Sequence, residues 1–284
     1  MKEKNGKVSI IVPVYNPGNR IKKCIKSILS QTFTDFEFLI LDDCPDESRE
    51  KIIASYSDER IKYTKNSCNL GISASRNKLI DMAQGEYLAV FDHDDISLPE
   101  RFAKEVAYLD ANPQCGVVSC AFKKLIENTV NVNPENNEQI TRKMFISCAL
   151  LHPAAMIRKS VLDNLNLRYE EKFSPAEDYA LWCRMIDKTE FHNLPEVLFY
   201  YRDHAQNTTH NQLQKMQDRT CFIQAFARIN NAALWKGIEQ QIRYVTYIKV
   251  FGIPMFKIVR CGQYSKCYLF DRITIYYSKT KVII

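Results

Sequence analysis

One apolar run ends directly in a cluster of acidic residues, and this feature constrains the fold more than any other. Residues Tyr87–Phe91 form an apolar run of strand length, which is typical of a strand covered on both faces of a parallel sheet. Three carboxylates follow at once, at Asp92, Asp94 and Asp95. Because ligands of open α/β sheets bind beyond the carboxyl ends of the strands, this position indicates a functional site.

The three aspartates are candidate metal ligands. Placing them this close together costs free energy through like-charge repulsion unless a cation neutralises them. Their hard oxygen atoms suit Mg²⁺ or Mn²⁺ rather than Zn²⁺. The alternative is a solvated turn whose aspartates cap the next helix. An EF-hand calcium loop is disfavoured, because its sixth position is Ser97 where glycine is required.

The first hundred residues alternate between strand and helix patterns with short connections. Strand patterns occur at residues 8–14, 36–41 and 61–64, and helix patterns at residues 21–29, 52–56 and 72–83. This alternation predicts a mostly parallel sheet with right-handed crossovers, which is a Rossmann-like half.

The second hundred residues show a less regular alternation. Helix patterns occur at residues 99–109 and 138–150, and strand patterns at residues 116–122, 154–157 and 197–201. Residues 127–138 are polar and rich in asparagine, so we expect a surface loop there. Pro175 is followed by Glu177 and Asp178, a pattern that predicts the start of a helix with acids in its first turn.

Composition excludes several classes of protein. The chain is 46% hydrophobic and 25% charged, as in ordinary globular proteins. No apolar run approaches the roughly 18 residues of a membrane span, and no signal-peptide core follows Met1. Ten cysteines occur without CxxC pairs, which indicates reduced thiols and a cytoplasmic protein. The net charge of +6 is concentrated in residues 211–284, where 12 Lys and Arg stand against three Asp and Glu.

Several segments, taken in order, resemble family 2 glycosyltransferases. The matching segments are Val8–Asn16, Ser27–Phe33, Leu41–Asp43, Asn69–Gly71, Arg76–Asn77, Gly85–Tyr87, Asp92–Asp95 and Glu177–Tyr179. The similarity covers roughly residues 7–205. It implies the GT-A fold, an α/β fold with a Rossmann-like, mostly parallel sheet flanked by helices. It also implies transfer of a sugar from a nucleotide sugar, with inversion at the anomeric carbon.

The resemblance assigns the nucleotide-binding positions. Pro13 and Tyr15 match residues that contact the base, and Asp43 matches the carboxylate that reads it. A carboxylate only accepts hydrogen bonds, so it can bind the imide N–H of uracil in a charge-assisted bond. The resemblance implies UDP as the expected nucleotide, although GDP and dTDP donors also occur in the family. The alternative for Asp43 is a turn between strand and helix.

The resemblance also assigns the diphosphate side of the donor. Asp92 and Asp94 match the DxD pair, which holds the ribose and the metal-bound diphosphate, and Asp95 is a further candidate ligand of the metal. A divalent ion, Mn²⁺ or Mg²⁺, neutralises the leaving diphosphate as a Lewis acid. Arg76 lies where a basic side chain can approach the diphosphate. The alternative for Arg76 is an exposed arginine on a helix.

Asp178 matches the catalytic base of the family. Inversion in one step requires deprotonation of the acceptor hydroxyl as it attacks, and a single carboxylate suffices, contributing about 10²–10⁴-fold. The alternative is an acid favoured by the helix dipole. Glu177, His152 and His204 are candidates for contacts with the acceptor or the diphosphate, although lone histidines are more often structural.

The family match fades near residue 212, and residues 211–284 are expected to form a helical, basic extension. Aromatic and basic residues alternate there, which suits an interfacial segment on an anionic membrane. Such an enzyme would lie peripherally on the inner face of the membrane and use a lipid-linked acceptor. The alternative is a helical subdomain packed on the catalytic half. No nucleic-acid-binding motif occurs, so no nucleic-acid partner is expected.

The sequence therefore predicts a glycosyltransferase domain at residues 1–210, with a nucleotide-binding half at about 1–100 and an acceptor half at about 101–210. Its expected partners are a nucleotide-sugar donor and a glycan or lipid-linked acceptor. The alternative function is a non-catalytic relative that binds a glycan or nucleotide, or assists assembly at a membrane. A nucleotidyltransferase is disfavoured, because residues 15–19 do not form a Gly-rich, basic phosphate loop.

Overall fold

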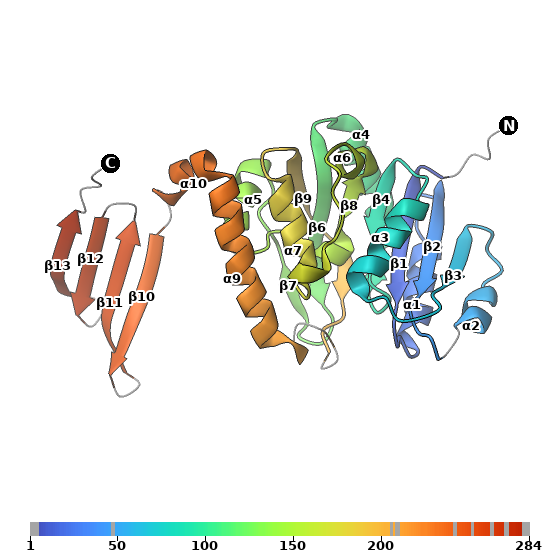
Figure 1. The fold of residues 1–284 in the computed structure, drawn as a ribbon, viewed down its shortest axis with the longest axis horizontal. Coiled ribbons are helices and arrows are strands. Elements are labelled where there is room, and N and C mark those ends of the chain that lie inside the picture. The colour runs from blue at the N-terminus through green and yellow to red at the C-terminus, as the bar shows by residue number, and fades with distance from the viewer. Residues whose placement is uncertain are drawn as a thin grey trace. The chain divides into compact units, whose positions relative to one another are not determined.

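The computed structural model divides the chain into two compact units, Met1–Ala227 and Arg228–Ile284, which are described separately (Figure 1). The structure describes residues 6–46, 49–204, 207, 211–240, 243–250, 253–261, 264–269 and 273–279, with side chains up to residue 240.

The first half of the first unit has the predicted alternation of strands and helices. Its elements are β1 (Val8–Val14), α1 (Arg20–Leu29), β2 (Phe36–Asp42), α2 (Glu50–Ala54), β3 (Ile61–Lys65), α3 (Ile72–Met82) and β4 (Tyr87–Val90). The strands lie in the order β3-β2-β1-β4, and each neighbouring pair is parallel. The predicted Rossmann-like half is confirmed.

Apolar side chains explain why these elements form and pack. Every residue of β1 and β2 is buried, as expected for strands covered on both faces. Helix α1 buries Ile21, Cys24, Ile25 and Ile28 on one side, at the spacing of one helical face.

The register of the strands brings their polar ends together. In the sheet, Val14 pairs with Asp42, and Ile11 pairs with Val90. The residues that follow β1, β2 and β4 therefore meet at one edge of the sheet, where a ligand site is expected in an open α/β fold.

The second half of the unit extends the same sheet. Its elements are β5 (Ile96–Ser97), α4 (Arg101–Ala111), β6 (Cys115–Lys124), β7 (Thr129–Asn131), α5 (Asn137–Met144), η1 (His152–Ala154), β8 (Met156–Arg158), α6 (Lys159–Asn164), η2 (Glu171–Phe173), α7 (Glu177–Met185) and β9 (Glu190–Tyr201). The sheet continues from β4 in the order β8-β6-β9-β5. Strand β8 is antiparallel to both neighbours, whereas β6 and β9 are parallel.

Part of the loop expected at residues 127–138 is a strand. β7 pairs with β6 in a hairpin, and Asn128 adopts a positive φ of 56° between them. Asparagine tolerates this conformation at low cost, which explains why the chain turns there.

The C-terminal extension differs from expectation beyond Glu239. It is helical in α9 (Leu213–Asn230) and α10 (Ala232–Glu239), as predicted. The chain then forms an antiparallel sheet of β10 (Arg243–Val250), β11 (Ile253–Cys261), β12 (Tyr264–Leu269) and β13 (Ile273–Lys279). These segments are rich in β-branched and aromatic residues, which favour strands over helices.

The side chains of the expected membrane-binding segment lie outside the described part of the chain. Within the described residues, no helix has the length and apolar character needed to cross a membrane.

Candidate functional site

A cavity of about 930 Å³ lies at the edge of the sheet where β1, β2 and β4 end, within the size range of small-molecule sites. It collects side chains from elements that are far apart in the sequence. The predicted residues that line it are Pro13, Tyr15, Asp43, Arg76, Asp92, Asp94, His152, Glu177, Asp178 and His204. Of the predicted site residues, only Asp95 does not line the cavity.

Asp43 anchors the start of α3 beside the cavity. Its carboxylate accepts hydrogen bonds from the backbone N–H groups of Leu70 and Gly71, at 2.9 and 3.0 Å, and from the Asn66 amide at 2.8 Å. The preceding Asp42 is fully buried and bonds the Tyr63 hydroxyl at 2.8 Å. Of this acidic pair, Asp43 is therefore the residue that lines the cavity.

Arg76 joins the two acidic motifs of the cavity. Its Nη2 atom lies 3.0 Å from Asp92 Oδ1, and its Nη1 atom lies 2.8 Å from Glu177 Oε1. Burial alone would lower the pKa of the guanidinium, but the charges of Asp92 and Glu177 raise it. The arginine therefore stays charged between two carboxylates.

The carboxylates of Asp94 and Asp95 point to different partners. Asp94 Oδ2 lies 2.9 Å from His204 Nε2. Asp95 Oδ1 accepts the backbone N–H of Arg202 at 2.7 Å, and within the described residues its Oδ2 atom is buried without a hydrogen-bond partner. Burial, followed by the charges of Asp94 and Asp92, raises the pKa of Asp95 well above its usual value. Asp95 is thus buried and does not line the cavity.

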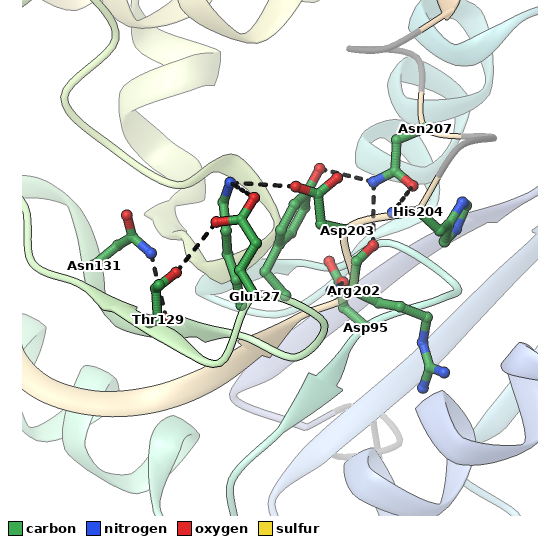
Figure 2. Close-up of polar contacts among 10 residues, drawn as sticks. Asp95, Glu127, Thr129, Asn131, Arg202, Asp203, His204 and Asn207 are labelled. Carbon is green, nitrogen blue, oxygen red and sulfur yellow. Dashed lines mark hydrogen bonds and ion pairs between the residues drawn. The ribbon is translucent and has the colours of Figure 1, made fainter.

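The segment after β9 is held by a polar network (Figure 2). Lys124 at the end of β6 pairs with Asp203 at 3.2 Å and with Glu127 at 3.0 Å. The Asn207 amide donates to the Arg202 carbonyl at 3.2 Å and to the Tyr201 hydroxyl at 2.8 Å. These contacts fix the backbone that carries His204 to the cavity.

Asp178 occupies the first turn of α7. Its Oδ1 atom accepts the N–H of Tyr179 at 2.7 Å. Burial raises the pKa of Asp178 to about 6, with a further contribution from the charge of Glu177. A carboxylate with this pKa is ionised at neutral pH and is a better proton acceptor than an ordinary aspartate, as a general base requires.

His152 is buried beneath the same cavity. Its Nε2 atom lies 2.8 Å from the Tyr169 hydroxyl. Burial, followed by the charge of Arg76, lowers the pKa of His152 well below its usual value. The imidazole is therefore neutral, and its Nε2 atom is engaged by the Tyr169 hydroxyl.

The cavity is strongly acidic. Six carboxylates and three permanently cationic side chains line it, a net formal charge of −3. The cations are Arg20, Arg76 and Lys215. The fixed charge of the cavity therefore disfavours a further anion unless positive charge enters with it.

The residues present fit a metal that is shared with a bound phosphate. Among the described side chains, no group of three or more His, Cys, Asp or Glu converges on one point. Asp92 and Asp94 nevertheless offer oxygen ligands at the cavity, with 31% and 16% of their side chains exposed. Mg²⁺ and similar ions are commonly held by one or two carboxylates together with substrate phosphates.

Sequence reasoning missed the cavity residues contributed by α9. Lys215, Met216 and Thr220 line the cavity, and Phe222 of the same helix contacts the Phe173 ring, with centroids 6.2 Å apart. The periodicity near Phe222 predicts the helix but not the surface on which it packs. Tyr169 was also missed, because it lies in no recognisable motif.

The sheet order and the acidic cavity define the GT-A fold. The chain resembles TarS of S. aureus (residues 1–349, in complex with UDP-GlcNAc) with a TM-score of 0.69 and 21% identity, over 82% of this chain and 70% of that one. It also resembles the mannosyltransferase PcManGT of Pyrobaculum calidifontis, in complex with GDP-Man and Mn²⁺. That likeness has a TM-score of 0.59 and 16% identity, over 81% of this chain and 66% of that one.

Sequence comparisons identify the family. The model of glycosyl transferase family 2 matches residues 9–165. An uncharacterized glycosyltransferase of Methanocaldococcus jannaschii is 33% identical over 255 residues, which are 86% of this chain and 84% of the relative. The chain belongs to glycosyl transferase family 2, as the motifs predicted.

A further relative has a more specific name. The UDP-Glc:α-D-GlcNAc-diphosphoundecaprenol β-1,3-glucosyltransferase WfaP of Escherichia coli is 27% identical over 213 residues, which are 74% of this chain and 82% of the relative.

Proposed function

We propose that this family 2 glycosyltransferase is a metal-dependent inverting enzyme that moves a sugar from a UDP-sugar to a hydroxyl of a glycan or lipid-linked acceptor. The observation that carries the proposal is the single cavity that gathers Asp43, the pair Asp92 and Asp94, and Asp178. These are the groups needed to bind a nucleotide, neutralise a diphosphate and accept a proton.

The nucleotide would bind along the ends of β1 and β2. Pro13 and Tyr15 offer contacts for the base, and Asp43 offers an acceptor for its imide N–H. UDP is favoured because TarS was solved with UDP-GlcNAc and because the name of the E. coli relative includes UDP-Glc. The Pyrobaculum enzyme binds GDP-Man, so GDP-Man belongs in any donor panel.

The diphosphate would bind near Asp92 and Asp94, with Asp94 as the principal protein ligand of Mn²⁺ or Mg²⁺ and Asp95 supporting it from below. A bound divalent ion acts there as a Lewis acid that neutralises charge on the leaving group. The Mn²⁺ in the Pyrobaculum structure supports the use of a divalent ion.

Asp178 would act as the general base. It accepts the proton of the acceptor hydroxyl while that oxygen attacks the anomeric carbon from the face opposite the diphosphate. The bond to the diphosphate breaks as the new glycosidic bond forms, so the configuration inverts in one displacement. The proton remains on the Asp178 carboxylate until it is lost to water.

The acceptor would enter on the side of α7 and α9. The name of the E. coli relative specifies an acceptor on diphosphoundecaprenol, which supports a lipid-linked acceptor here. Such an acceptor would bring the enzyme to the inner face of the membrane as a peripheral protein.

A transfer assay tests the proposal directly. The chain is incubated with Mn²⁺, a panel of α-linked nucleotide sugars (UDP-Glc, UDP-GlcNAc and GDP-Man) and acceptors that are either free glycans or GlcNAc on a polyprenyl diphosphate. We expect one UDP-sugar to be consumed, and NMR of the product to show a β-linkage. An α-linked product would contradict inversion. If no nucleotide sugar is consumed with any of the acceptors, the transferase assignment is contradicted.

We expect Asp94→Asn to lower metal-dependent donor affinity by at least about tenfold, because the amide has lost the charge that attracts the ion. Titration calorimetry with UDP, with and without Mn²⁺, measures this change. Asp81→Asn is the matched control, because Asp81 is an exposed aspartate that does not line the cavity. Equal UDP affinity in wild type and Asp94→Asn would remove Asp94 from the site.

The rate should depend on pH through Asp178. Because the base must be ionised and its pKa is raised to about 6, we expect the rate to fall as pH drops below 6. Glu177→Gln removes a like charge, which lowers the pKa of Asp178. The pH at which the rate falls should therefore move down by up to about one unit. Profiles of log(kcat/KM) against pH, which report groups of the free enzyme, measure the shift. A shift to higher pH would contradict the assignment of Asp178 as the base.

A further inference from the structure

Helix α3 connects three parts of the cavity. The backbone N–H groups of Leu70 and Gly71, just before its first residue Ile72, donate to the Asp43 carboxylate. Arg76 lies about one turn further on and reaches Asp92 and Glu177. Helix α3 and the residues just before it therefore contact Asp43, Asp92 and Glu177 in the first turn of α7.

We propose that Arg76 is a positioning residue that sets Glu177, and through it the neighbouring Asp178 carboxylate, against the donor-side Asp92, and that it is not a ligand of the diphosphate. This inference rests on the proposed function, in which Asp178 is the base.

The geometry of the guanidinium supports this role. Its two terminal nitrogens bond different carboxylates, at 2.8 Å to Glu177 and 3.0 Å to Asp92. The guanidinium is planar and rigid, so it fixes the separation of the two carboxylates that it bridges. Only 6% of the Arg76 side chain and 7% of the Glu177 side chain are exposed, so water screens these contacts poorly.

Further contacts hold Arg76 in this orientation. The guanidinium lies 5.5 Å from the centre of the Tyr169 ring. The Tyr169 hydroxyl lies 2.8 Å from His152 Nε2, and the Tyr169 backbone exchanges two hydrogen bonds with the Asn77 side chain. These contacts hold the guanidinium in the orientation in which it bridges the two carboxylates.

The ion pair also ties down the start of α7, whose N-cap residue provides no capping side chain. The N-cap residue is Ala176, which makes no side-chain cap hydrogen bond and is among the poorest N-cap residues. The first turn, which carries Glu177 and Asp178, is instead tied to α3 across 101 residues of sequence. The position of the base is thus set from the donor half of the fold.

Lysine cannot reproduce this arrangement. It keeps the charge, but its single ammonium is a point charge on a flexible stem and does not bridge two carboxylates with a fixed fork. Arg76→Lys therefore separates charge from geometry, and Arg76→Met removes both.

The test compares kcat with donor affinity in Arg76→Lys and Arg76→Met. We expect kcat to fall roughly 10–100-fold in the lysine variant and further in the methionine variant, since misplacement of a catalytic group by about 1 Å can cost 10²-fold. Donor Kd should stay within about threefold of wild type in Arg76→Lys, because the lysine keeps the positive charge beside Asp92 and removes no donor contact. A tenfold weaker donor Kd with unchanged kcat would overturn the proposal and assign Arg76 to the diphosphate. Unchanged kcat in both variants would overturn it as well.

Arg101→Lys is the matched control. Arg101 is also a buried arginine paired with a glutamate, at 3.0 Å from Glu105, but it does not line the cavity. If loss of a buried arginine acts only through stability, the two lysine variants will lose kcat in proportion to their loss of Tm. Under the proposal, the kcat of Arg76→Lys falls much further than its loss of Tm alone would explain.

A double-mutant cycle of Arg76 and Glu177 tests the proposal even if Arg76→Met folds poorly. Glu177→Met leaves Arg76 without its partner on α7, and the double variant buries no unpaired charge at either position. We expect Arg76→Met to cost less kcat in the Glu177→Met background than in wild type, because the two residues act as a unit. Additive losses would contradict the proposal. If wild type transfers no sugar, the proposed function fails; if wild type is active but the cycle is additive, only the role of Arg76 fails.

Discussion

Asp178→Asn should lower kcat by roughly 10²–10⁴-fold while leaving nucleotide-sugar affinity unchanged. Asparagine keeps the size of the side chain and its hydrogen bond from the Tyr179 N–H, but an amide cannot accept the proton of the acceptor hydroxyl. Donor contacts are made by residues on other elements, so binding is spared. Steady-state kinetics and titration calorimetry with UDP-sugar measure the two effects separately.

Glu190→Gln is the control for this substitution. Glu190 is an exposed carboxylate at the start of β9 and should leave both kcat and donor affinity unchanged. A loss of less than about threefold in kcat for Asp178→Asn would contradict its assignment as the base. An equal loss of donor affinity would show that Asp178 contributes to binding instead.

Arg101→Leu should destabilise the fold by about 3–5 kcal/mol, because it leaves Glu105 buried without its counter-ion. Arg101 and Glu105 are both fully buried and lie 3.0 Å apart. The guanidinium also lies 5.1–5.5 Å from the ring centres of Phe91, Phe102 and Phe199. Burial raises the pKa of Glu105 to about 7 even with Arg101 beside it. Urea unfolding followed by circular dichroism measures the loss.

The double variant Arg101→Leu, Glu105→Leu is the informative control. Replacing both members of a buried ion pair with apolar residues of similar size is often neutral or stabilising. The double variant should therefore be more stable than Arg101→Leu alone. A single variant that loses less than about 1 kcal/mol would contradict the view that Arg101 stabilises the fold as the counter-ion of the buried Glu105.

The donor half of the fold could be predicted because its signals are local. The apolar runs of β1, β2 and β4 specify buried strands, and each is followed within a few residues by a turn or by acids. Once the strands are parallel, their carboxyl ends share one edge of the sheet. Tyr15, Asp43 and Asp92 are therefore brought together without any knowledge of the acceptor half.

Long-range pairing could not be predicted in the same way. The bond from Arg76 to Glu177 spans 101 residues, and the bond from the Arg202 N–H to Asp95 spans 107. Sequence pattern indicates that each residue is charged, but only tertiary packing determines its partner. For the same reason, the sequence predicts Asp95 as a candidate metal ligand but does not indicate that its side chain is buried beside the cavity.

The extension shows a second limit. Aromatic and basic residues alternate after residue 243, and this composition suits an amphipathic helix or a strand. The four antiparallel strands form where β-branched and aromatic residues dominate. The contribution of α9 to the cavity follows from packing at Phe173 and Phe222, which no local pattern specifies.

Thermal unfolding with a panel of nucleotide sugars, each with and without Mn²⁺, tests the central claim most directly. A ligand at a hundred times its Kd should add about 2.7 kcal/mol to the free energy of unfolding, which raises Tm by several degrees. We expect UDP-sugars to raise Tm only when Mn²⁺ is present, and we expect no such rise in Asp94→Asn. No rise with any nucleotide sugar, or a rise of equal size in Asp94→Asn, would contradict a metal-assisted donor site in this cavity.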